Sequence, residues 1–135
     1  MGFTKMKYLI AFFLFTLSHV TFCQSPITGN WKLISVNDLL LNKTDTAISA
    51  EAGAFIKFKG DTLLGGRLSK NEVLGSYQIL KDNIKIRILS ITEMCCDTKE
   101  SQRLLEISGM NTFSIRDSSL VLESRQKLFF FRKVE

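Results

Sequence analysis

The sequence predicts a mainly β domain: a small antiparallel β-barrel or rolled sheet with one α-helix near residues 98–108. Three observations lead to this fold class. Apolar segments of strand length recur between turn residues such as Gly60-Asp61 and Asp117-Ser118. In residues 84–88 (IKIRI), apolar and basic residues alternate, as in a strand with one buried face. The connections are short, so neighbouring strands are expected to be antiparallel, and a sheet of this kind tends to close on itself.

The expected strands follow one another along most of the chain. They cover residues 31–36, 55–59, 62–68, 75–80, 84–88, 112–116, 119–123 and 127–132. Residues 37–53 are mostly polar and are expected to form a loop or a short helical turn. Gly65-Gly66 lies inside a strand and indicates a bulge or a sharp bend.

The helix is predicted from capping residues on either side of an apolar stripe. Asp97 is expected to cap the N-terminus, and Glu100 three residues later would complete a capping box. Leu104 and Ile107 lie on the apolar side, and Gly109 is suited to ending the helix. These residues predict a helix that packs on the sheet or across one end of the barrel.

The N-terminal residues resemble an export signal. Lys5 and Lys7 precede an uncharged apolar run over residues 8–17, and a more polar segment leads to Gln24. The run is shorter than the roughly 18–20 residues that cross a bilayer, so we expect a cleavable signal peptide over residues 1–23. A domain over residues 24–135, without a transmembrane segment, would remain. The alternative is lipoprotein processing at Cys23, which would attach a lipid anchor.

Few chemically active groups remain after such a cleavage. The only histidine is His19, so the expected domain lacks Ser-His and Cys-His pairs and histidine metal ligands. Its cysteines, Cys95 and Cys96, are too few to complete a structural zinc site. The net charge falls from +5 to about +3 with the loss of Lys5 and Lys7, and the other basic residues are dispersed, which disfavours nucleic-acid binding. We therefore expect no enzyme, with no catalytic residue, metal or cofactor.

Cys95 and Cys96 are the candidate redox or structural cysteines. An exported protein meets an oxidising compartment, so a vicinal disulfide or a redox-reactive pair is one interpretation. Neighbouring residues of a strand point to opposite faces. This favours the other interpretation, in which one cysteine is buried as a small hydrophobe and the second is left without a partner.

Three further patterns are expected to be structural. Gly29-x-Trp31 is similar to the opening of lipocalin-like barrels, where the tryptophan packs beneath an arginine of the last strand, and Arg132 is placed for that role. Such a barrel keeps a second function open, that of a carrier for a small apolar ligand.

Residues 129–131 (FFF) are explained by a strand buried on both faces. The acidic side chains, Asp97 among them, are expected to be solvated surface.

An ordered set of motifs spans most of the expected domain. A G-x-Y strand is followed by a T-x-M-x-C segment, an acidic helix and a closing hairpin that ends in an L-x-F-x-R-like strand. The motif residues are Trp31, Asn71, Gly75, Tyr77, Thr92, Met94 and Arg132. In this order the motifs resemble the META domain family, which includes the bacterial heat-shock protein HslJ. The resemblance implies structural roles for these residues.

The sequence departs from the family pattern at one position. The family's G-C-N triplet reads Ser69-Lys70-Asn71 here, so a bridge from its middle position to Cys96 is excluded. The resemblance implies an envelope protein linked to stress tolerance. We therefore expect an exported, non-catalytic protein, periplasmic or secreted or associated with the outer membrane. It would bind an unidentified protein or envelope component.

Overall fold

The computed structural model describes residues 26–41, 43–45 and 53–135. Its elements are β1 (Gly29–Asp38), β2 (Lys43–Asp45), β3 (Phe55–Lys59), β4 (Leu63–Arg67), β5 (Glu72–Leu80), β6 (Asn83–Ile91), α2 (Lys99–Gln102), the 3₁₀ helix η1 (Arg103–Ile107), β7 (Gly109–Arg116), β8 (Ser119–Glu123) and β9 (Lys127–Val134). The expected signal peptide and both processing alternatives at Cys23 lie outside the described residues.

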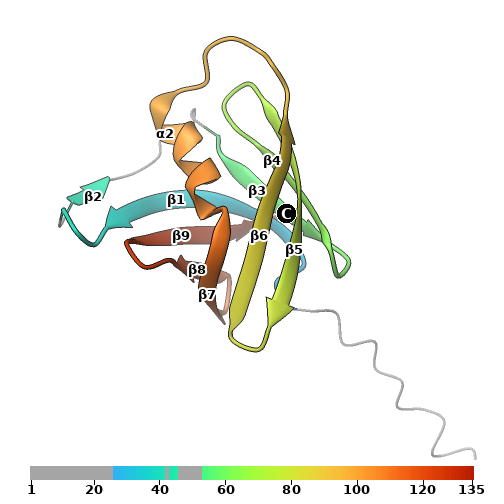
Figure 1. The fold of residues 1–135 in the computed structure, drawn as a ribbon, viewed down its shortest axis with the longest axis vertical. Coiled ribbons are helices and arrows are strands. Elements are labelled where there is room, and N and C mark those ends of the chain that lie inside the picture. Colours follow the sequence, from blue (N-terminus) through green and yellow to red (C-terminus); the bar gives the residue numbers. More distant parts are fainter. Residues whose placement is uncertain (1–25, 42, 46–52) are drawn as a thin grey trace, which may run out of the picture.

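The strands form one antiparallel sheet that closes into a barrel (Figure 1). From β3 to β9 each strand pairs with the next along the chain, and β1 pairs with both β3 and β9, which closes the ring. From β3 to β9 the turns are short, which requires antiparallel neighbours, except between β6 and β7, where the connection contains α2 and η1. The short β2 pairs with the far half of β1, beyond the stretch that β3 occupies. The predicted class, a mainly β barrel with one helical segment, is confirmed.

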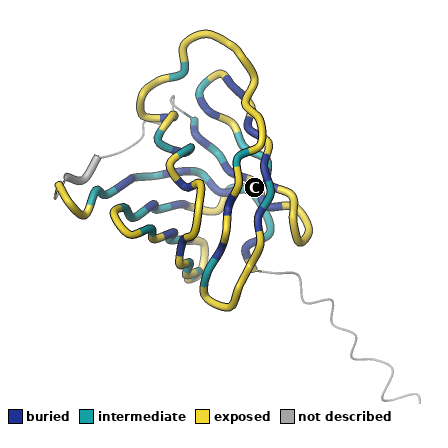
Figure 2. Tube along the Cα trace, in the orientation of Figure 1, coloured by how far each residue is buried: buried dark blue, intermediate teal, exposed yellow. Residues whose placement is uncertain are grey.

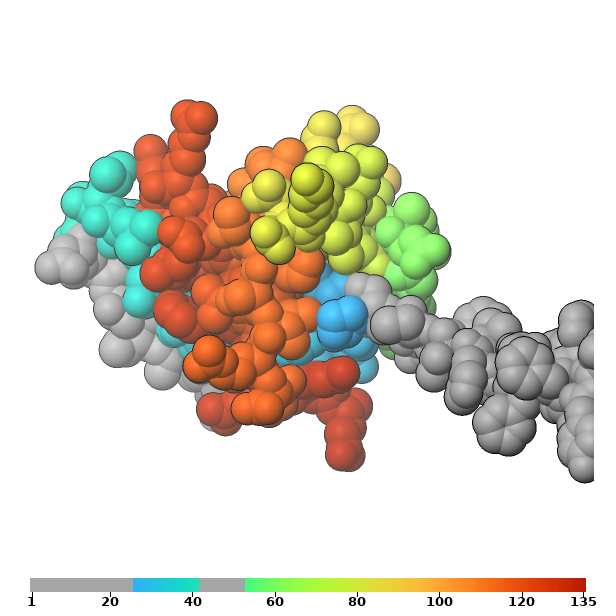
Figure 3. All heavy atoms as spheres, turned by 90° about the horizontal axis from the view of Figure 1, so that it is seen from below, coloured from blue at the N-terminus to red at the C-terminus, as the bar shows by residue number. Residues whose placement is uncertain are grey.

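Apolar residues alternate along the strands and fill the interior of the barrel. In β3, Ile56 and Phe58 are buried while Lys57 and Lys59 are exposed, as the two faces of a strand require. Figure 2 shows the buried positions along the strands and the exposed ones mainly in the turns. The largest fully buried side chains come from all around the ring: Trp31, Phe58, Phe129, Ile27, Leu33, Ile56, Leu68, Ile84, Ile86, Ile107, Leu120 and Leu122. Seen from below, the atoms of the first and last strands meet in one continuous surface (Figure 3).

Two local predictions about the strands are wrong. Residues 37–53 were expected to lack strands, yet β1 extends to Asp38 and β2 pairs with it. Gly65-Gly66 forms no bulge, because β4 keeps an unbroken register with both of its neighbours. The register shift lies instead in the pairing of β5 with β6, where Leu74 pairs with Ser90 and Gly75 with Ile88, so that Leu89 of β6 is skipped. Gly66 instead allows a close approach, since a Cβ there would lie 2.9 Å from the carbonyl oxygen of Phe55.

The helical segment between β6 and β7 is capped differently from the prediction. Thr98 is the N-cap of α2, and its Oγ1 accepts a hydrogen bond from Ser101 N at 3.2 Å. Asp97 is not the cap, because its carboxylate bonds to another turn of the chain. Gly109 does stop the helical segment as predicted: it directly follows Ser108, the C-cap of η1, has a φ of 113° and begins β7.

This helical segment covers a gap in the barrel. β6 and β7 pair only over residues 83–86 and 109–112, which leaves the rest of β6 without β7 beside it. Figure 1 shows α2 and η1 at this place, beside β6 and in front of β1. Leu104 and Ile107 of η1 are buried in the core, so the helical segment packs against the barrel. Within the described ranges, no helix is long and apolar enough to cross a membrane.

Candidate functional site

Asn71, in the turn between β4 and β5, is the centre of a polar cluster that joins the family motifs. Its side chain is 5% exposed. Its Nδ2 donates to Met94 O at 2.8 Å, and its Oδ1 accepts from Met94 N at 2.6 Å. The same oxygen accepts from Thr92 Oγ1 at 2.9 Å. The amide of Asn71 therefore pairs with the backbone of the chain that follows β6, much as a neighbouring strand would.

Asp97 completes this cluster from the far side of the same loop. Its Oδ1 accepts from Lys70 N at 2.7 Å, from Asn71 N at 3.1 Å and from Ser69 Oγ at 3.1 Å. Its Oδ2 accepts from Asn71 Nδ2. Partial burial alone would raise the pKa of the Asp97 carboxyl, but these hydrogen bonds outweigh it and lower the pKa. The expectation that Asp97 is solvated surface is wrong, because the turn at Ser69 offers it several donors.

Two serines that the sequence-based prediction missed connect the cluster to the helix. Ser69 Oγ accepts from Thr98 N at 2.9 Å and from Ser101 Oγ at 3.2 Å. Ser101 is fully buried. In the sequence, the position of Ser69 beside Asn71 in the altered triplet was the only indication that Ser69 belongs to this cluster. Nothing in the sequence pointed to Ser101. We call Ser69, Asn71, Thr92 and Asp97 the Asn71 cluster.

Cys95 and Cys96 lie in the loop over residues 92–98, which we call the cysteine loop. Both cysteines are exposed and form a disulfide with each other. The interpretation in which one cysteine is buried and the other lacks a partner is therefore wrong. It assumed that both residues lie in a strand, but β6 ends at Ile91. The Asn71 cluster holds Met94 before the pair and Asp97 after it.

The motif methionine acts through its backbone. The side chain of Met94 is 60% exposed, while its N–H and its carbonyl both bond to Asn71. Thr92 uses its hydroxyl, which also accepts from Glu72 N at 2.9 Å and so attaches the loop to β5. The T-x-M part of the motif therefore positions the cysteine loop and contributes no side chain to a pocket.

The G-x-Y motif serves packing between strands. A Cβ on Gly75 would lie 2.4 Å from the carbonyl oxygen of Arg87, so β5 and β6 approach closely there. Tyr77 contacts Phe58 edge to face, with 4.9 Å between ring centroids, and its hydroxyl donates to Gly60 O. Burial and the nearby Asp61 carboxylate raise the pKa of Tyr77.

Trp31 is covered by a lysine instead of the predicted arginine. Lys133 Nζ lies 5.7 Å from the centroid of the Trp31 ring. The register explains the difference, because Trp31 pairs with Lys133 while Arg132 pairs with Lys32 on the other face. Arg132 is exposed. The indole of Trp31 is fully buried and donates to Ile27 O at 2.8 Å, so this residue is part of the core.

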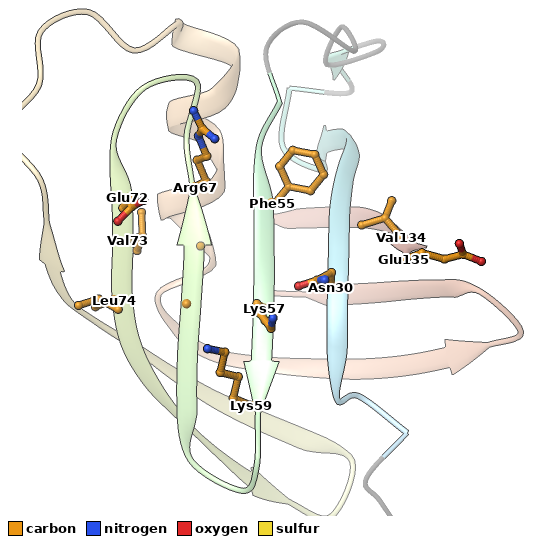
Figure 4. Close-up of a pocket in the computed structure, with 12 residues that line it drawn as sticks. Asn30, Phe55, Lys57, Lys59, Arg67, Glu72, Val73, Leu74, Val134 and Glu135 are labelled. Carbon is orange, nitrogen blue, oxygen red and sulfur yellow. The ribbon is translucent and has the colours of Figure 1, made fainter.

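An open groove of about 500 Å³ crosses the outside of the barrel over β1, β3, β4 and β5 (Figure 4). Lys57, Lys59 and Arg67 lie in its middle. Glu72 and Glu135 lie at opposite margins of the view. Lys57, Lys59, Arg67 and Glu72 belong to the outward positions of their strands, since the residues between them face the core, and Glu135 follows the end of β9.

The strand pairing shows that further basic side chains lie beside the groove. Lys32 pairs with Phe55 on one side and with Arg132 on the other, which places both basic residues in the row that Arg67 continues. Leu63 and Leu74, each 62% exposed, lie on the same outer surface. We call the outward side chains Lys32, Lys57, Lys59, Arg67 and Arg132 the basic face. Of these, only Arg132 was singled out from the sequence, and for a different role.

The groove and the cysteine loop differ in the chemistry that they offer. The described residues contain no group of three or more histidine, cysteine, aspartate or glutamate side chains placed to hold a metal ion. What the groove offers is an open surface with positive charge and exposed leucines. The cysteine loop offers one accessible disulfide.

Solved structures share this fold at low sequence identity. A protein from Burkholderia xenovorans aligns with a TM-score of 0.66 at 17% identity, over 80% of this chain and 83% of that one. A DUF4847 family protein from Bacteroides vulgatus gives 0.59 at 14% identity, over 81% and 96%. A lipocalin-like protein from Bacteroides uniformis gives 0.55 at 21% identity, over 82% and 100%. These likenesses establish the fold alone.

Family membership comes from the sequence itself. No curated protein matches the chain. The sequence model of the META domain matches residues 24–135, which include every motif residue in the Asn71 cluster and in the G-x-Y strand. The chain therefore belongs to the META domain family.

Proposed function

We propose that this protein is an exported, non-catalytic binding protein of the cell envelope, and that its basic face binds anionic lipid. The observation that carries the proposal is the groove on the outside of the barrel, where Lys57, Lys59 and Arg67 gather beside the exposed Leu63 and Leu74. The non-catalytic part is supported by composition, since the only histidine of the chain is His19.

The mixture of charge and apolar surface favours a lipid over a small soluble anion. Each basic side chain close to an anionic membrane surface contributes about 1 kcal/mol to binding. Lysine and arginine also bury their aliphatic stems while the charged ends stay in water. An open groove with Leu74 at its side can therefore contact acyl chains and headgroups at once.

The interior of the barrel does not support the alternative of an internal carrier. A site for a small apolar ligand needs an enclosed cavity of about 300 Å³ or more. Here Trp31, Phe58 and Phe129 are fully buried in the core, together with many leucine and isoleucine side chains. Ile88, Phe113 and Ile115 pack against the same core. The open groove lies on the opposite side of the sheet.

Vesicle flotation tests the lipid proposal. We expect the protein to float with phosphatidylglycerol vesicles and to stay behind with phosphatidylcholine vesicles. Lys57→Gln with Lys59→Gln removes two charges of about 1 kcal/mol each and should weaken binding roughly 30-fold. The matched control is Lys85→Gln with Arg87→Gln, the same spacing on the exposed face of β6 and outside the groove. Equal loss in both variants, or binding to neutral vesicles, contradicts the proposal.

Export and processing are tested on the native protein. Intact mass spectrometry of the envelope fraction should give a chain that starts at Gln24, and a lipid on Cys23 would instead support the lipoprotein alternative. The family resemblance adds a link to stress, which predicts a higher amount of protein after envelope stress. Full-length protein in the cytoplasm contradicts the export part of the proposal.

A further inference from the structure

The position of the Cys95–Cys96 disulfide makes it reachable by other thiols. Both cysteines are exposed, and no strand covers them. Figure 2 shows the long loop between β6 and α2 at the top of the molecule, exposed along nearly its whole length. Thiol–disulfide exchange requires that a thiolate reach one sulfur in line with the bond, and burial is the usual obstacle. That obstacle is absent at this loop.

The disulfide contributes little to holding the fold together. A disulfide stabilises a protein mainly by closing a loop of the unfolded chain, and the effect grows with loop length. Cys95 and Cys96 are adjacent, so the closed loop is the shortest that a chain can make. The Asn71 cluster already holds Met94 on one side and Asp97 on the other through hydrogen bonds. The disulfide is therefore not needed to hold this loop in place.

The backbone at the pair favours opening. Cys96 has a φ of 79°, in the left-handed region that side chains other than glycine seldom adopt. Such a conformation costs energy and persists only where its surroundings impose it. Reduction lets Cys96 leave this conformation, while the hydrogen bonds of Asn71 keep the two ends of the loop in place.

From these three observations we infer that Cys95–Cys96 is a redox site that exchanges electrons with dithiol proteins while the barrel stays folded. A donor thiolate attacks one sulfur, which forms a mixed disulfide and releases the other cysteine as a thiolate that takes up a proton. The second donor thiol, after losing its proton, then attacks the mixed disulfide and releases the remaining cysteine. The donor dithiol becomes a disulfide, and two electrons and two protons pass to Cys95 and Cys96. The basic face takes no part.

Native alkylation tests the inference. The folded protein is incubated with dithiothreitol, treated with iodoacetamide without denaturant, and measured by intact mass spectrometry and circular dichroism. We expect both cysteines to be labelled. In a parallel sample that is reduced but not alkylated, the disulfide should return when excess oxidised glutathione replaces dithiothreitol. The melting temperature should stay within about 2 °C of the oxidised protein, since the disulfide closes so short a loop.

Variants separate exchange from structural damage. Cys95→Ser keeps one thiol, and oxidised glutathione should form a stable adduct with it that dithiothreitol removes. The double variant Cys95→Ser with Cys96→Ser should fold with the same melting temperature and accept no label. Labelling that needs denaturant, loss of the folded signal on reduction, or two free thiols that excess oxidised glutathione cannot rejoin would each overturn the inference.

Discussion

At the scale of single residues, Asn71 and Asp97 decide how the family motif works. A buried amide carries both donors and an acceptor, and Asn71 uses both kinds on the backbone of Met94. Asp97 accepts the N–H groups of the turn at Lys70 and Asn71. A buried polar network of this kind is stabilising only while every member is paired. The family motif here builds the loop that presents Cys95 and Cys96.

Asp97 should make the stability of the domain depend on acid pH. Its native pKa is lowered, so the carboxylate stabilises the fold fully above the unfolded pKa of about 3.9, and this contribution is lost as the pH falls toward the native value. Asp97→Asn removes that dependence. Urea unfolding at a series of pH values should show the wild type more stable at pH 7 and the difference shrinking below about pH 4. Parallel stability curves for the two proteins would contradict this assignment.

At the scale of the strands, close contact between neighbouring backbones explains why glycine stands at positions 66 and 75. Gly65-Gly66 suggested a bulge in the sequence, but the register there is unbroken. Gly66 and Gly75 both lie where a Cβ would meet a neighbouring backbone oxygen, at 2.9 and 2.4 Å. A backbone oxygen cannot move aside as a flexible side chain can. Such positions determine how tightly adjacent strands pair.

Gly75→Ala should separate β5 from β6 locally. The new Cβ would lie 2.4 Å from Arg87 O and 3.0 Å from Leu64 Cδ2, an overpacking that typically costs about 1–3 kcal/mol. Gly65→Ala is the matched control, because nothing lies within 4 Å of its Cβ position. Chemical denaturation should show a lower midpoint for the first variant and almost no change for the second. A similar loss in both would contradict the close contact at Gly75 as the cause.

At the scale of the whole molecule, closure of the sheet puts the core inside and the candidate binding surface outside. β1 pairs with both β3 and β9, so residues from the two ends of the domain share one interior. Lys57, Lys59 and Arg67 reach the opposite side of the same strands. The binding surface proposed above lies on this outer face, so it makes no demand on the packing of the core.

Phe129→Ala tests which face of the closing strand, β9, packs into the core. Phe129 is fully buried, and truncation of such a phenylalanine typically costs about 3–5 kcal/mol. Phe130 is only partly buried and faces the other side of β9, so Phe130→Ala serves as the control and should cost clearly less. Urea unfolding with both fluorescence and circular dichroism should show one shared transition in each variant. An equal loss from the two positions would contradict the assigned faces.

The sequence by itself determined most of the strands and their antiparallel order, because apolar alternation and short turns are local signals. Its ordered motifs determined the family. The bridging roles of Asn71 and Asp97, and the substitution of Lys133 for Arg132 over Trp31, were decided only by the tertiary structure. The bulge in β1 between Leu33 and Ser35, invisible in the sequence, contributes to the register of the closing pair. Which residues meet across a barrel depends on that register, since a shift of one residue turns every side chain to the other face.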